Sequence, residues 1–416
     1  MPAWSGIVET VVPARLGRGF RWLLGATVVN NVGDGIAIAA GPLLLASLTG
    51  DPFIVSLGLL VQYLPTLLFG VLGGTFADRF DRRRMVIAVD LGRAFVLAVL
   101  AVTIAIERVD IVIVLVALFV LATGETFADS ASSSLTPRLV RREHLGIANA
   151  RMQGAFLLAN QLVAPPIGAA LFAIGMALPF ATNAACFALG ALLVSRILRS
   201  RGVIVSERSS GLREDMVEGI RWLIGHPPMR TLALTIFAFN ITYGAAWGVL
   251  VLYAHDRLGL GAVGFGLLTT AVAIGGIVGT SAYGRLERRF ALADMMRGGL
   301  LIETFTHLTL ALTTVPAIAF VTMGVFGAQA FVWGTTSETV RQRAVPDELL
   351  GRVTGVYRVA SVGGLVVGTP IGGLLAGAYG ITAPFWFGFI GSLALVVVLW
   401  RRFADIVHAG DVRPPA

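Results

Sequence analysis

Residues 74–84 read GTFADRFDRRR, and six of these eleven residues are charged. The stretch lies between two long apolar runs, in a chain of 416 residues of which only 13% are charged and whose mean hydropathy is +0.82. Soluble domains carry roughly 25% charged residues. The composition therefore predicts a membrane protein, in which residues 74–84 form a polar hinge between two membrane spans.

Apolar runs separated by short polar hinges recur along the whole chain. In a bilayer, each backbone N–H and C=O must be bonded within a helix or a closed barrel. Runs of about 20 apolar residues suit helices, whereas barrel strands are short and alternate in polarity. The sequence predicts an all-α polytopic membrane protein with twelve transmembrane helices. We expect them at residues 22–48, 53–77, 85–106, 111–135, 148–174, 177–198, 230–254, 262–284, 295–314, 316–340, 350–378 and 381–402.

Arginine is unevenly distributed among the hinges. Positively charged residues stay on the cytoplasmic side of a membrane, so the arginine-rich hinges and both termini are predicted to be cytoplasmic, in a bacterial inner membrane. The hinges on the opposite side contain only Arg108 and Arg257. The arginine-rich hinges are 78–84, 136–147, 199–230, 285–297 and 341–347.

The chain also repeats itself at an offset of 205 residues. Gly74 then falls on Gly279, and Pro165 falls on Pro370. A parallel repeat of two six-helix halves is typical of transporters that bind substrate between the halves, near the middle of the membrane. The predicted domains are a cytoplasmic tail (1–21), a first half (22–198), a cytoplasmic linker (199–229), a second half (230–402) and a second cytoplasmic tail (403–416).

The linker contains a candidate amphipathic helix at residues 211–225. An amphipathic helix of this kind can lie on the inner membrane face, although a plain tether between the halves is an open alternative. The apolar residues at helical spacing are Leu212, Met216, Ile220 and Leu223.

The charged hinge resembles the signature of the major facilitator superfamily, in which a glycine, three residues and Asp-Arg precede a basic cluster. The family usually has a second glycine where this chain has Asp81. The resemblance implies the major facilitator fold and a conformational latch that stabilises the outward-facing state. A cluster that only sets the topology is the alternative. The latch residues are Gly74, Asp78, Arg79, Arg82 and Arg83.

A second signature lies in the fifth predicted helix. NQLVAPPIGAALF, with its repeat VVGTPIGGLLAG, resembles the glycine- and proline-rich element of exporters in this superfamily. Proline removes a backbone donor and glycine removes side-chain bulk, so such helices can bend and slide; ordinary close packing is the alternative. The hinge residues are Pro165, Pro166, Gly168, Pro370 and Gly373.

Longer stretches resemble the drug- and siderophore-exporter branch, which includes macrolide and enterobactin exporters. They are GDGIAIAAGPLLLASLTG, EGIRWLIGHPPMRTL and ETVRQRAVPDELLGRVTGVYR. This resemblance covers nearly the whole chain. It implies export of a small molecule.

Carboxylates within the predicted spans are functional candidates, because an ionised group inside a bilayer is costly. Asp34 lies in the first helix beside Asn30 and Asn31, and Glu125 and Asp129 lie one turn apart in the fourth. Like-charge repulsion between the latter two suits a proton carrier. We expect these acids to lack a basic partner, since no basic residue occurs between Arg108 and Arg138. Structural hydrogen bonds to neighbouring helices are the alternative.

Other polar side chains fall in the first, seventh and tenth predicted spans. Amide and aromatic groups suit a cavity for amphiphilic molecules, with core packing as the alternative; the candidates are Asn30, Asn31, Asn240, Tyr243, Trp247, Gln329 and Trp333. Glu303 and His307, one turn apart in the ninth helix, are interpreted as a satisfied structural pair.

The leading interpretation is a secondary transporter that exports a small amphiphilic molecule, such as a drug, antibiotic or siderophore-like compound, in exchange for protons. An importer or facilitator of the same fold is the alternative. A membrane enzyme is less well supported, because the sequence has five histidines without metal-binding spacing and no phosphate-binding loop. We expect a monomer in contact with membrane lipids, protons and substrate, with no cofactor, metal or nucleic acid.

The arginine distribution leads to a test of topology. Reporter fusions at Ala416 and near Ser209 are expected to give cytoplasmic signals, because the adjoining hinges are arginine-rich. A fusion beside Arg257, on the predicted outer side, is the matched control. A periplasmic signal at Ala416 or Ser209 would contradict the twelve-helix arrangement.

Overall fold

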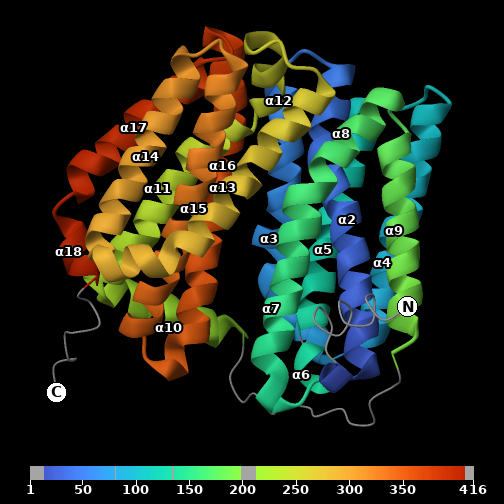
Figure 1. Ribbon diagram of the computed structural model, residues 1–416, viewed down its shortest axis with the longest axis horizontal. Coiled ribbons are helices and arrows are strands. Elements are labelled where there is room, and N and C mark those ends of the chain that lie inside the picture. The colour runs from blue at the N-terminus through green and yellow to red at the C-terminus, as the bar shows by residue number, and fades with distance from the viewer. Residues whose placement is uncertain (1–13, 80, 134, 198–211, 408–416) are drawn as a thin grey trace, which may run out of the picture. The chain divides into compact units, whose positions relative to one another are not determined.

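The structure is a computed structural model that describes residues 14–79, 81–133, 135–197 and 212–407. All regular elements among these residues are helices (Figure 1), so the predicted all-α class is confirmed. The helices of the first half of the chain are η1 (Ala14–Leu16), α2 (Gly17–Leu48), α3 (Pro52–Arg79), α4 (Arg82–Ala105), α5 (Ile111–Ser133), α6 (Thr136–Leu139), η2 (Arg142–His144), α7 (Leu145–Ala155), η3 (Phe156–Val163), α8 (Ala164–Ile174) and α9 (Leu178–Ser195).

The second half follows the linker helix α10 (Leu212–Gly225). Its helices are α11 (Pro227–Trp247), α12 (Leu250–Leu252), η4 (Tyr253–Arg257), α13 (Ala262–Arg289), α14 (Leu292–Leu312), α15 (Pro316–Ala344), α16 (Asp347–Tyr379), α17 (Ala383–Leu399) and α18 (Arg402–Val407). Each of the twelve predicted ranges is occupied by one of these helices or by consecutive ones.

Several of these helices, alone or joined to the next one, are candidate membrane spans. Within the described residues, nine are long and apolar enough, and a tenth span results if α11 is joined to the helix that follows it at a bend of 42°. The helix α17 is apolar but shorter, with 17 residues. The helix α14 has 21 residues and includes Asp294, Arg297 and Glu303.

The fifth span is not one regular helix. Between α7 and α8, η3 is π-helical over eight residues, and the Ala164 N–H bonds the carbonyl of Ala159. Pro165 directly follows; it has no N–H to donate, and its ring would clash with the carbonyl four residues earlier. A widened π turn removes this conflict. The sequence predicts that this element can bend and slide, which stays a prediction; the structure shows a π segment just before its prolines.

Packing divides the chain into two compact units, which we describe separately. The first unit comprises residues 1–48 and 68–207, and the second comprises residues 49–67 and 208–416. The start of α3 therefore packs with the second half of the chain, unlike in the predicted domains. Gly373 explains this, because a Cβ on Gly373 would lie only 2.6 Å from the Phe53 Cα.

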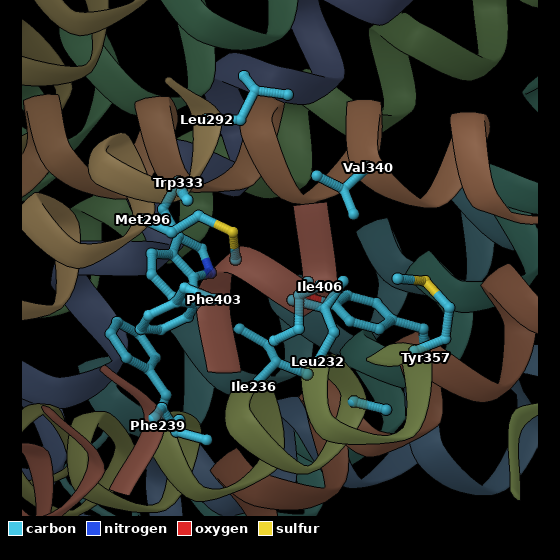
Figure 2. Packing of buried hydrophobic residues seen from close by; sticks show 14 of the residues in the cluster. Leu232, Ile236, Phe239, Leu292, Met296, Trp333, Val340, Tyr357, Phe403 and Ile406 are labelled. Atoms are coloured by element: carbon cyan, nitrogen blue, oxygen red, sulfur yellow. The ribbon is translucent and has the colours of Figure 1, made fainter. Parts of the chain in front are cut away.

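A hydrophobic cluster forms the core of the second unit (Figure 2). Phe239 of α11 stacks on Trp333 of α15, with ring centroids 6.0 Å apart. The short helix α18 closes the cluster with Phe403 and Ile406, both fully buried. The core thus joins the first and last helices of this half.

The linker helix α10 binds the N-terminal part of α16 by ion pairs. Arg352 lies 2.7 Å from Asp215 and 2.5 Å from Glu218. Leu223 is buried in the core of the second unit, so it does not belong to a membrane-facing stripe. Ile220 is exposed, and so are Val217 and Ile224. We therefore still propose that α10 has an apolar face on the membrane surface, formed by these three residues.

The charged hinge is described in part. The Arg83 guanidinium donates hydrogen bonds to the carbonyl oxygens of Val194, at 3.2 Å, and Ser195, at the C-terminal end of α9. Asp81 caps α4 by accepting from the Arg84 N–H at 3.1 Å. The side chains of residues 71–80 lie outside the described residues, so the latch predicted at Gly74, Asp78 and Arg79 stays a prediction.

Close approach of α2 and α8 depends on Gly168. A Cβ at this position would lie 2.5 Å from the Ile36 carbonyl oxygen. We therefore expect Gly168→Val to separate the two helices and to destabilise the protein by about 1–3 kcal/mol, as overpacking does. Gly154→Val is the matched control, because a Cβ there meets nothing within 4 Å. Thermal unfolding in detergent measures the difference; equal loss in both variants would contradict the argument.

Candidate functional site

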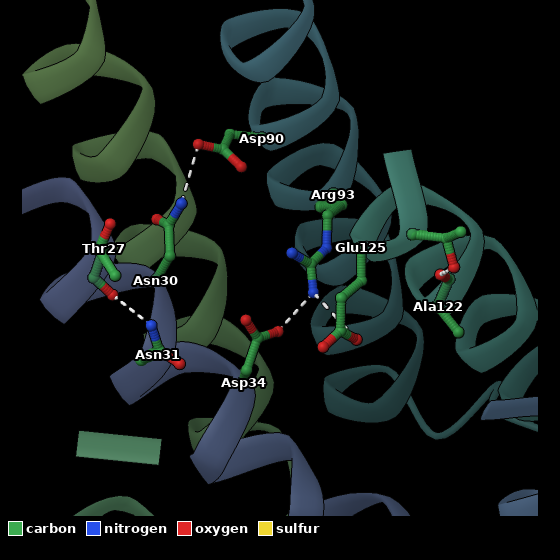
Figure 3. Close-up of polar contacts among 9 residues, drawn as sticks. Thr27, Asn30, Asn31, Asp34, Asp90, Arg93, Ala122 and Glu125 are labelled. Atoms are coloured by element: carbon green, nitrogen blue, oxygen red, sulfur yellow. Dashed lines mark hydrogen bonds and ion pairs between the residues drawn. The ribbon is translucent and has the colours of Figure 1, made fainter. Parts of the chain in front are cut away.

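The candidate site lies in the first unit, around an ion pair between two helices (Figure 3). Asp34 of α2 accepts a hydrogen bond from the guanidinium of Arg93 of α4. The side chains are 18% and 6% exposed, respectively. A charged pair at this depth in a membrane-spanning helix needs each partner, since removing one leaves an uncompensated buried charge.

Three further contacts hold the Arg93 side chain in place. Its aliphatic stem lies on α5, where a Cβ on Gly124 would be 3.0 Å from the Arg93 Cγ. Its guanidinium lies 3.9 Å from the ring centroid of Phe187, which is fully buried on α9, and forms a cation–π contact. Its Nη2 atom also lies 3.9 Å from the Glu125 Oε2. Arg93 therefore joins α2, α4, α5 and α9.

A second acid extends the site along α4. Asp90 is fully buried one turn before Arg93, and it accepts a hydrogen bond from the Asn30 amide at 2.9 Å. Asn31, in contrast, donates to the carbonyl of Thr27 in its own helix, at 2.8 Å. One carboxylate oxygen of Asp90 and the Nε atom of Arg93 have no hydrogen-bond partner within the described structure.

The site has more acidic than basic groups. Asp34, Asp90 and Glu125 surround the one guanidinium of Arg93, and Asp129 follows one turn after Glu125 on an exposed position. If the first three acids were ionised, their charge with Arg93 would be −2. Uncompensated charge is unfavourable in hydrocarbon. The arrangement can therefore bind a cation, either a proton or a positively charged group.

The prediction that the acids of the fourth helix lack a basic partner is wrong. Arg93 comes from the third predicted helix, where DLGR at residues 90–93 interrupts the apolar run 85–106. Asp90 and Arg93 both meet the criterion that singled out Asp34, an ionisable residue within a span. The sequence thus contained the signal for both residues.

The polar candidates of the second half have different environments. Asn240 donates to the Ser361 hydroxyl at 2.9 Å. Tyr243 stacks on Trp247, with ring centroids 4.3 Å apart. Gln329 and Trp333 are only 4% and 5% exposed, inside the second unit. Their predicted place in a substrate cavity therefore stays a prediction.

No group of three His, Cys, Asp or Glu side chains in the described part of the chain could hold a metal ion.

A family model described as transmembrane secretion effector matches residues 9–413. The chain belongs to this family. It is a transporter of the major facilitator superfamily rather than an enzyme, as the signatures at residues 74–84 and in the fifth span indicated.

Two curated relatives of this secretion effector cover nearly its full length. The multidrug efflux pump Tap of Mycolicibacterium fortuitum is 29% identical over 393 residues, which are 90% of this chain and 93% of Tap. The enterobactin exporter EntS of Escherichia coli is 26% identical over 405 residues, 92% of this chain and 93% of EntS. The resemblance to the exporter branch is confirmed.

A solved structure supports the fold. A bacterial homologue of the iron transporter ferroportin, in its inward-facing state, superposes with a TM-score of 0.74 at 19% identity, covering 94% of this chain and 98% of the other. The predicted major facilitator fold is therefore confirmed.

The stability of the site depends on balanced charge. We expect Arg93→Met to destabilise the secretion effector by about 3–5 kcal/mol, because Asp34 and Glu125 lose their common partner. Adding Asp34→Asn to Arg93→Met should recover part of this loss, since fewer unpaired charges stay buried. Arg141→Met, at a side chain 80% exposed, is the control. Thermal unfolding of the purified variants measures each effect, and additive losses in the double variant would contradict the coupling.

Proposed function

We propose that this transporter exports small amphiphilic molecules in exchange for protons, by alternating access. Its sequence relation to an efflux pump and to an enterobactin exporter supports export. The observation that carries the proton coupling is the sharing of one guanidinium, Arg93, by acids from two other helices. Such a group of acids gains stability from each cation it takes up.

Glu125 is the acid best suited to load the proton. Asp34 contacts Arg93 directly, whereas the closest oxygen of Glu125 is 3.9 Å away and its side chain is 49% exposed. An ionised carboxylate cannot face hydrocarbon without a large cost. The exposed part of Glu125 is therefore protonated or in contact with water, and both conditions suit exchange. Asp34 keeps Arg93 neutralised in the meantime.

Competition for the acids links proton and substrate. When Glu125 loses its proton, the site carries an additional negative charge that attracts a cationic or zwitterionic substrate. When a proton returns, this attraction ends and the substrate is released. Exchange requires that the site binds either the proton or the positively charged substrate, but not both at the same time. Asp129, one turn away, raises the local negative charge and favours the same competition.

The proposed arrangement in the cell follows the arginine distribution. Both termini and the linker face the cytoplasm of a bacterial inner membrane, and the transporter works as a monomer. The substrate moves from the cytoplasmic to the outer side.

Transport in proteoliposomes tests the mechanism. With ethidium as the cationic amphiphilic probe and an imposed pH gradient, Glu125→Gln and Asp34→Asn are each expected to abolish accumulation, because the amide keeps the shape but carries no exchangeable proton. Glu143→Gln, at an exposed loop position, is the matched control and should transport normally. Counterflow, which needs no net proton movement, should survive in at least one of the two variants.

Two results would contradict the proposal. If the variant lacking Asp34, Glu125 and Asp129 still accumulates ethidium in response to the pH gradient, these acids do not carry the proton. If wild-type cells accumulate ethidium, and an uncoupler prevents this uptake, the transporter is an importer.

A further inference from the structure

Two ionisable side chains of the second unit are completely buried. Glu303 and His307 lie one turn apart on α14, each 0% exposed, and the His307 Nε2 lies 3.0 Å from the Glu303 Oε1. We call this pair the Glu303–His307 dyad. The interpretation as a satisfied structural pair is only half right, because the Glu303 Oε2 and the His307 Nδ1 have no partner within the described structure.

More unpartnered polar atoms lie next to the dyad. Gly299 precedes Glu303 by one turn, and a Cβ on Gly299 would be 3.3 Å from the Gln329 Nε2 and 3.0 Å from the Trp333 ring. Both amide atoms of Gln329 and the indole Nε1 of Trp333 lack partners within the described residues. Each buried polar group without a partner destabilises the folded protein. Five such atoms along adjoining faces of α14 and α15 therefore require an explanation other than stability.

The imidazole ring of the dyad is held between α11 and α17. The edge of Trp247 meets the His307 ring at a centroid distance of 6.2 Å and an interplanar angle of 85°. On the α17 side, a Cβ on Gly388 would lie 2.5 Å from the His307 Nδ1. Gly388 thus leaves the space that admits the ring, and the ring is shielded from solvent.

Few titratable groups face the dyad. From α11, Tyr243 lies close enough to Glu303 to be influenced by its charge. The helix α17 contains no ionisable residue. The charged residues of α13 begin at Arg285 and those of α15 begin at Glu338, so they lie in the last two turns of these helices. Those of α18 adjoin the start of α14, where Arg297 pairs with Asp294 at 2.8 Å. The charge of the dyad is therefore set by its own two side chains.

We propose that the Glu303–His307 dyad binds one exchangeable proton and forms a second protonation site, separate from the acids around Arg93. One proton lies in the hydrogen bond between the His307 Nε2 and the Glu303 Oε1. With this proton alone, the dyad has a charge of −1. A second proton sits on the His307 Nδ1 or on the Glu303 Oε2, the two unpartnered atoms, and makes the dyad neutral. Burial in an apolar unit favours the neutral, loaded form.

Release of this proton requires hydrogen-bond donors for the carboxylate that remains. The Gln329 amide and the Trp333 indole carry unpaired N–H groups one turn away, and Gly299 leaves room for the amide to move. A rotamer change of Gln329 that brings its N–H to the Glu303 Oε2 stabilises the unloaded form. The unpartnered N–H groups of Gln329 and Trp333 are thus the donors of the alternative state.

Spectroscopy of the purified protein tests the site without transport. Replacing the histidines at 144, 226, 255 and 408 by glutamine leaves His307 as the one histidine of the five in the chain. With ¹⁵N-labelled histidine in nanodiscs, its imidazole is titrated between about pH 5 and about pH 8. Infrared spectra over the same range detect a protonated carboxyl group. We expect one of the two signals to report uptake of a single proton.

Variants assign this signal to the dyad. Glu303→Gln should remove the carboxyl band, or shift the midpoint of the histidine titration by at least about one pH unit, as loss of a close opposite charge does. Glu287→Gln, at a partly exposed position on α13, is the matched control and should change neither signal. A single neutral tautomer of His307 at every pH, with no carboxyl band that depends on Glu303, would overturn the proposal. If Glu303→Gln does not fold, the titration of the protein with Glu303 intact still shows whether the dyad takes up a proton.

The role of the dyad in transport rests on the proposed function, and a separate measurement addresses it. In proteoliposomes, Glu303→Gln should lower the number of protons exchanged per ethidium by one, whereas Glu125→Gln abolishes driven transport. If the wild type shows no proton-driven transport, the proposed function fails while the spectroscopic titration still decides the dyad. An unchanged proton count in Glu303→Gln would overturn its coupling role.

Discussion

The first unit is organised around one buried guanidinium. Arg93 can stay charged within a membrane-spanning helix only because Asp34 contacts it, Glu125 approaches it and the Phe187 ring covers its face. Gly124 is small because the arginine stem lies on it. The helices α2, α5 and α9 thus each contribute residues that contact Arg93. The acids around Arg93 outnumber this single cation, and the proposed exchange of protons rests on this excess.

Glycines, which have no side chain, allow the helices to approach one another closely. Between helices in lipid, the hydrophobic effect supplies no attraction, so small residues that allow close approach carry much of the association. Gly168 brings α8 against the backbone of α2 next to the π-helical η3. On α16, Gly373 brings the start of α3 into the second unit. The same residue types that were predicted as hinges therefore also serve as contact points, and these two interpretations are compatible.

The sequence predicted the helices better than the contacts of their side chains. Hydropathy places a span to within a few residues, as for α5 at 111–133 against the predicted 111–135. Hydropathy does not indicate which residue of another helix will lie opposite a given side chain. Arg93, which is on a different helix from Glu125, was therefore not predicted as its partner. The π turn in η3 depends on how one proline fits its preceding turn, which composition alone does not specify. Leu223 was predicted on a membrane-facing stripe because periodicity cannot distinguish lipid from a neighbouring helix as the apolar surroundings.

The internal repeat clarifies which features belong to the fold and which to the chemistry. At the offset of 205 residues, the prolines and glycines of the fifth and eleventh spans correspond, because both halves need the same close packing. The charged groups do not correspond: Asp34 falls on Phe239, Arg93 on Gly298 and Glu125 on Ala330, while Glu303 and His307 fall on Ala98 and Val102. A duplicated scaffold therefore carries different buried polar groups in its two halves. Since a buried ionisable group destabilises a membrane helix unless it is compensated, each half has its own means of compensation, a shared arginine in one and a carboxylate–imidazole hydrogen bond in the other. In the mechanism that we propose, these two sites would bind protons through different chemistry, so that one half could hold its proton while the other exchanges.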